Sequence, residues 1–80
     1  MEFVAECFWP DVSEADVEAL DRRVVQATRG SAVRYLGSIL LRDDEVVLCR
    51  FEGTAAMVEE VAVLAEIPFE RILRSKEVHT

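Results

Sequence analysis

The sequence predicts a single α+β domain, residues 1–80, whose elements run strand, helix, strand, strand, helix, strand. Two stretches repeat apolar residues with helical spacing, and four shorter stretches alternate or are rich in Val, Ile and Leu. With 80 residues, of which 51% are hydrophobic, the chain can form one small core, and its dispersed charges argue against disorder. One domain is therefore expected.

The first half of the chain predicts a strand followed by a helix. The strand, Glu2–Trp9, alternates between two sets of side chains. Ser13 with Asp16 three residues later forms a capping-box pattern, which places a helix over Glu14–Arg29. Gly30 then provides a stop signal for that helix.

The second half predicts a hairpin, a helix and a last strand. Val33–Arg42 and Glu45–Glu52 flank an acidic turn and read as an antiparallel pair. Thr54 can cap a second amphipathic helix that ends before Pro68. The last strand is predicted over Phe69–Val78.

Right-handed crossovers fold this β-α-β-β-α-β order into a four-stranded antiparallel sheet with both helices on one face, the ferredoxin-like arrangement. Strand alternation assigns one set of side chains to the helix-covered face: Phe3, Cys7, Trp9, Val47, Cys49 and Phe51. The open face is predicted to carry three charged residues, Glu6, Arg50 and Arg74, among large apolar ones, namely Val4, Phe8, Leu36, Leu48 and Ile72. Because such a face is too hydrophobic for water, we expect a homodimer that forms through it.

The three predicted charges on the open face have two interpretations. Glu6 can form a structural ion pair with Arg50 or Arg74, since buried charges need partners whether or not a ligand exists. Alternatively, the same residues line a cavity that holds a small anion or an organic ligand.

Composition excludes several classes of protein. The chain has 16 acidic against 9 basic residues and a net charge of −7, without a basic cluster, so nucleic acid is not an expected partner. No apolar run approaches the roughly 20 residues that span a bilayer, and the N-terminal stretch is acidic where a signal peptide is basic. We therefore expect a cytoplasmic location and no membrane partner. Phosphate-loop, dinucleotide and hydrolase motifs are absent, so no catalytic residues are predicted.

The candidate metal ligands are few. His79 is the only histidine, and Glu77 lies two residues before it. Asp43 and Asp44 supply carboxylate oxygens at the hairpin turn, although such a turn is also simply a polar tip.

Cys7 and Cys49 fall on neighbouring central strands and on the same face in this topology. They lack the spacing of a metal-binding cysteine motif and have no histidine nearby. We interpret both as reduced, buried core residues.

Several strings in the same order as the predicted elements resemble small actinobacterial nickel-binding proteins with a dimeric ferredoxin-like fold: "FWP", "LDRR", "VRYLGS", "DEVVLC", "FEG" and "IPFER". For the wider group the resemblance implies site residues at Glu6 and Cys49, as alternates to the ligands above. Many wider relatives place a histidine where this sequence has Leu36, which departs from the shared pattern. The closer branch implies Ni²⁺ at the dimer surface, for sequestration or detoxification.

These observations predict a homodimeric Ni²⁺-binding protein without catalytic turnover. The alternative is a dimeric α+β barrel enzyme or small-molecule-binding protein that uses Glu6 with Arg50 or Arg74. A structural or interaction module is a third possibility.

Overall fold

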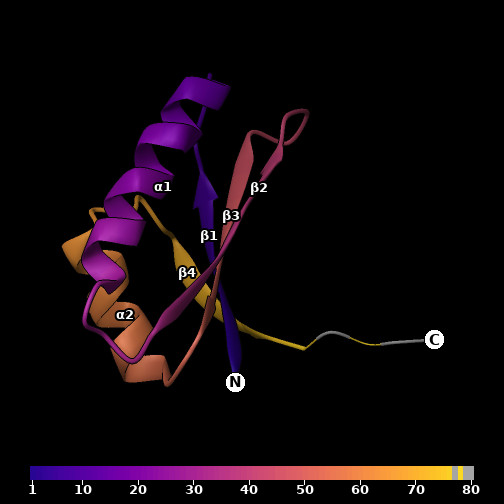
Figure 1. The fold of residues 1–80 in the computed structure, drawn as a ribbon. Coiled ribbons are helices and arrows are strands. Elements are labelled where there is room, and N and C mark those ends of the chain that lie inside the picture. Colours follow the sequence, from indigo (N-terminus) through magenta and orange to yellow (C-terminus); the bar gives the residue numbers. More distant parts are fainter. Residues whose placement is uncertain (77, 79–80) are drawn as a thin grey trace.

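The computed structural model describes residues 1–76 and 78 and has the predicted order of elements. In chain order these are β1 (Glu2–Phe8), α1 (Glu14–Thr28), β2 (Arg34–Leu41), β3 (Val46–Glu52), α2 (Ala55–Leu64) and β4 (Arg71–Ser75). Both helices lie on the same side of the sheet, as Figure 1 shows.

The four strands form one antiparallel sheet in the order β2-β3-β1-β4. This is the ferredoxin-like arrangement, and the predicted fold class is confirmed. The core lies between the sheet and the helices, and its largest fully buried side chains come from both layers: Phe51, Leu20, Val24, Val47, Val58, Cys7 and Cys49.

The start of α1 follows the predicted capping box. The backbone N–H of Asp16 donates to Ser13 Oγ at 3.1 Å, and the Ser13 N–H donates to Asp16 Oδ2 at 2.9 Å. These bonds satisfy two donors that the first helical turn leaves free. The helix ends at Thr28, one residue before the predicted end, and Gly30 follows with a φ of +72°.

A β-bulge in β2 changes which side chains face the helices. Tyr35 lies opposite Phe51 and Gly37 opposite Arg50, so Leu36 is an extra residue without a cross-strand partner. Beyond the bulge, Ser38 lies opposite Cys49 on the helix-covered side. Uninterrupted alternation from Leu36 would have placed Ser38 on the open face.

Gly37 makes this bulge possible because its φ of +110° is a conformation that side chains disfavour. A Cβ added there would meet nothing within 4 Å, so only backbone strain opposes substitution. We expect Gly37→Ala to lower the free energy of unfolding by about 1–3 kcal/mol in chemical denaturation. Unchanged stability would show that β2 can adopt another backbone conformation at this position.

The last strand is shorter than predicted, and its two faces are reversed. Arg74 lies opposite Phe3 and Ile72 opposite Ala5, so both belong to the helix-covered side and not to the open face. The prediction failed because Ile72 and Leu73 are both apolar, and alternation alone cannot then tell which set faces inward. β4 ends at Ser75, because Ser75 pairs with Glu2, the first residue of β1.

Candidate functional site

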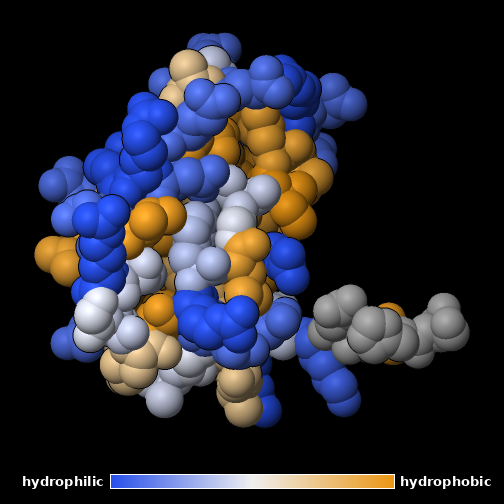
Figure 2. Space-filling view, viewed as in Figure 1, coloured by the Kyte–Doolittle hydropathy of each residue, from blue (hydrophilic) through white to orange (hydrophobic). Residues whose placement is uncertain are grey.

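The open face is the surface of the sheet opposite the helices, and one end of it is apolar. Leu41, Val46 and Phe8 lie side by side across three strands, next to Ile39 and Leu48. The Phe8 side chain is 50% exposed. Figure 2 shows apolar side chains gathered over the β2–β3 hairpin, whereas the surface over α1 is mostly hydrophilic. This end therefore offers hydrophobic contact area without a cover in the monomer.

The other end of the open face is charged and internally paired. Arg34 Nη1 lies 3.1 Å from Glu52 Oε1, and Arg50 Nη2 lies 4.0 Å from Glu2 Oε2. These pairs are partly solvated and contribute little to stability. They set the polarity of this end of the sheet.

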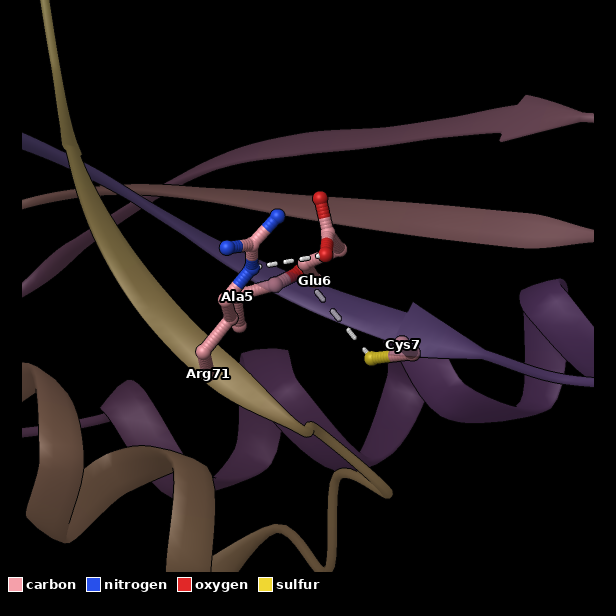
Figure 3. Close-up of polar contacts among 4 residues, drawn as sticks. All are labelled: Ala5, Glu6, Cys7 and Arg71. Atoms are coloured by element: carbon pink, nitrogen blue, oxygen red, sulfur yellow. Dashed lines mark hydrogen bonds and ion pairs between the residues drawn. The ribbon is translucent and has the colours of Figure 1, made fainter.

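Glu6 lies at the border of the apolar end and is paired with Arg71. The Arg71 Nε–H donates to Glu6 Oε1 at 2.9 Å, and this hydrogen bond raises the pKa of Arg71. In Figure 3 both side chains extend from the side of the sheet away from the helices, whereas Cys7 points toward α1. The carboxylate therefore keeps a partner within its own chain.

The predicted cavity residues are only partly brought together. Glu6 and Arg50 share the open face, as predicted, and Arg50 is near an acid, Glu2. Arg74 lies on the other side of the sheet, and Arg71 occupies the place predicted for it. Sequence reasoning missed Arg71 because the register between β1 and β4 decides which residue of β4 lies opposite Glu6.

Cys7 and Cys49 are fully buried free thiols on the helix-covered side, as predicted. The Cys7 Sγ lies 3.9 Å from the carbonyl oxygen of Ala5. Hydrogen bonding to Cys49, together with burial, raises the pKa of Cys7. The same contact lowers the pKa of Cys49.

A polar cluster between α1 and the sheet was not predicted. Asp21 of α1 accepts hydrogen bonds from the Tyr35 hydroxyl and, at 3.0 Å, from the Ser38 hydroxyl. Burial, followed by the bond to Asp21, raises the pKa of Tyr35. The cluster satisfies its own polar groups, so it anchors α1 to β2 and does not present a reactive group.

The predicted metal ligands are spread over the molecule. Asp43 and Asp44 are exposed at the tip of the β2–β3 hairpin. Glu6 and Cys49 lie on opposite faces of the sheet, because Leu48 is the residue opposite Glu6. These two residues of one chain therefore cannot hold the same ion.

His79 and Glu77 lie outside the described residues. Within residues 1–76 and 78, no three His, Cys, Asp or Glu side chains are grouped so that they could hold a metal ion. A metal site that used the described residues of one chain would therefore need further ligands from a neighbouring copy, from water or from the C-terminal residues.

Comparison with known proteins supports the fold. No family profile and no curated protein matches the chain. A solved structure, SCO4226 from Streptomyces coelicolor A3(2), superposes with a TM-score of 0.84 over 99% of this chain and 100% of that one, at 12% sequence identity. At this identity the likeness to an actinobacterial protein concerns the fold alone. No helix in the described part of the chain is long and apolar enough to cross a membrane.

Proposed function

We propose that this chain is a homodimer that binds Ni²⁺ at surface sites and serves in metal sequestration or detoxification. The metal follows from the resemblance of the ordered strings to nickel-binding proteins. The structural observation that supports it is the exposed pair Asp43 and Asp44, which takes part in no ion pair among the described residues.

The homodimer is supported by the uncovered apolar end of the open face. Ile39 and Leu41 are exposed there beside Phe8, although the other face of β1 and β3 is buried beneath the helices. A core this small gains stability when a second copy covers such a surface. A two-fold axis would place the same apolar end on both copies.

The chemistry of the candidate ligands suits nickel. Carboxylate oxygen and imidazole nitrogen are accepted ligands of divalent first-row metals, and Ni²⁺ binds such sites more tightly than Mn²⁺ or Co²⁺. Asp43 and Asp44 provide the oxygens, and His79 beside Glu77 provides the imidazole. Ligands from a second dimer would complete the coordination, so excess metal is expected to crosslink dimers.

Calorimetric titration of tag-free protein with Ni²⁺ tests the proposal. We expect binding by the parent and roughly tenfold or greater loss of affinity in His79→Ala or in the double variant Asp43→Asn with Asp44→Asn. Imidazole must be deprotonated to bind metal, so the affinity should fall below about pH 6.5.

Cys49→Ala is the matched control for this titration. It should bind Ni²⁺ like the parent and lose about 1 kcal/mol of stability, since it removes only a buried thiol. No heat from the parent would reject nickel binding. A large loss in the Cys49 variant would make this thiol a ligand.

A second candidate function is favoured by the charges beside the apolar end. Facing sheets of a dimer would bring Glu6, Arg71 and Arg50 toward an enclosed space, as in a dimeric α+β barrel enzyme or a small-molecule-binding protein. Native mass spectrometry of the purified dimer distinguishes the two functions. An organic molecule that is retained by the parent and lost in Arg50→Met supports this candidate, and a mass of two bare chains opposes it.

A further inference from the structure

The outer face of α2 exposes apolar side chains that no other part of the described chain covers. Val58, Val61 and Ala62 face the core, yet Val63 and Leu64 on the other side are 63% and 70% exposed. Glu59 and Glu60 are the only polar side chains of this helix. A helix that is apolar on both sides normally has a second contact surface.

A groove of about 1040 Å³ lies between α2 and the end of α1. Small residues line much of it, namely Ala27, Gly30, Ala32 and Ala56. Met57 and Leu64 add larger apolar side chains. The small residues allow the backbone of a partner to approach closely, and the groove is open to solvent along α2, where a chain segment can lie.

The charges along the groove are all of one sign. Among the described residues that line it, only Glu59 and Glu60 are charged, and neither belongs to an ion pair there. Arg29 precedes the groove but does not line it. Arg23 lies in the next hollow, where its Nε–H donates to the carbonyl oxygen of Ala65 at 3.0 Å. The groove thus combines apolar surface with unpaired negative charge.

We propose that this groove binds a short cationic amphipathic helix of another protein. Apolar side chains spaced one helical turn apart would pack beside Leu64 and Met57, while lysines or arginines would meet Glu59 and Glu60. The ten residues of α2 span about 15 Å, enough for roughly three turns of a partner helix. A second copy with a net charge of −7 is a poorer electrostatic match.

This surface is independent of the proposed dimer and metal sites. The helices lie on the side of the sheet opposite the open face (Figure 1), so dimerisation through that face leaves the groove accessible. The two surfaces can therefore be tested separately in the same full-length protein.

The test titrates the full chain with two synthetic peptides and follows backbone amide signals by NMR. Both peptides are about four turns long and carry leucines at i, i+3, i+4 and i+7, with lysines at the other positions in one and glutamates in the other. We expect the lysine peptide to bind, with shifts confined to α2 and the end of α1. Its affinity should fall by about tenfold or more in Leu64→Gln and in the double variant Glu59→Lys with Glu60→Lys.

Val25→Gln is the matched control, because Val25 is an exposed apolar residue of α1 that does not line the groove. Its affinity should equal that of the parent. The proposal is overturned by absence of binding, by equal binding of the glutamate peptide, or by binding that Leu64→Gln does not weaken. Self-association of the parent that Leu64→Gln abolishes would instead assign the groove to a second copy.

Discussion

Replacing Leu48 by Asp is expected to dissociate the proposed dimer into monomers. Leu48 lies in the centre of the open face, opposite Glu6 on β1 and Ile39 on β2. The new carboxylate would face Glu6 directly, where like charges repel, and would be an unpaired charge within the covered interface. A penalty of about 3 kcal/mol weakens dimerisation by about 100-fold, which sedimentation measures at micromolar concentration.

The matched control is Val63→Asp, a similar apolar-to-acid change on the helix side, where the side chain is largely exposed. This variant should keep the mass of the parent. Circular dichroism shows whether the Leu48 variant is a folded monomer or an unfolded chain, and either is consistent with a stabilising interface. A monomeric parent, or a Leu48 variant that remains a dimer, would contradict the proposed interface.

Patterns that depend on neighbouring residues were predicted well. The capping box at Ser13 and Asp16 formed because both bonds lie within one turn of the chain. Alternation in β1 and β3 placed Cys7 and Cys49 correctly, since these central strands are buried on one face and their apolar residues alternate with less buried ones. Local signals therefore determine most of the fold.

Features that depend on the pairing of distant strands were not predicted. The bulge at Leu36 moves Ser38 under α1, and only then can its hydroxyl reach Asp21. The register of β4 selects Arg71 over Arg74 as the partner of Glu6. In both cases a shift by one residue exchanges the two faces of a strand, and the sequence carries no local signal for that shift.

The candidate metal site illustrates the same limit. The resemblance implied Glu6 and Cys49 together, and the sequence spacing does not show that their side chains leave the sheet on opposite sides. Cys49 packs in the core beside Cys7, whereas Glu6 bonds Arg71 on the open face. The exposed carboxylates of the hairpin tip thus remain the stronger candidates within the described residues.

Stability is expected to fall steeply in alkaline solution because of Cys7 and Tyr35. Both groups have raised pKa values in the folded protein, against ordinary values of 9.0 and 10.0. The folded chain thus keeps protons that the unfolded chain releases, so the stability is intact below about pH 9 and declines above it. Each retained proton lowers the free energy of unfolding by about 1.4 kcal/mol per pH unit, which amounts to about 4 kcal/mol at pH 11.

Two variants separate these contributions. The double variant Cys7→Ala with Cys49→Ala should remove the decline that begins near pH 9, because Cys7→Ala alone would take from Cys49 the contact that lowers its pKa. Tyr35→Phe should remove the part that begins near pH 10, when urea unfolding is measured at one fixed protein concentration. Cys49 adds nothing to the loss, because its lowered pKa lets it ionise no later in the folded chain than in the unfolded one. An unchanged slope in the double variant would mean that the Cys7 thiol ionises freely in the folded protein. The core beside β1 would then be open to water, and the closed packing of Cys7 against Cys49 would be wrong.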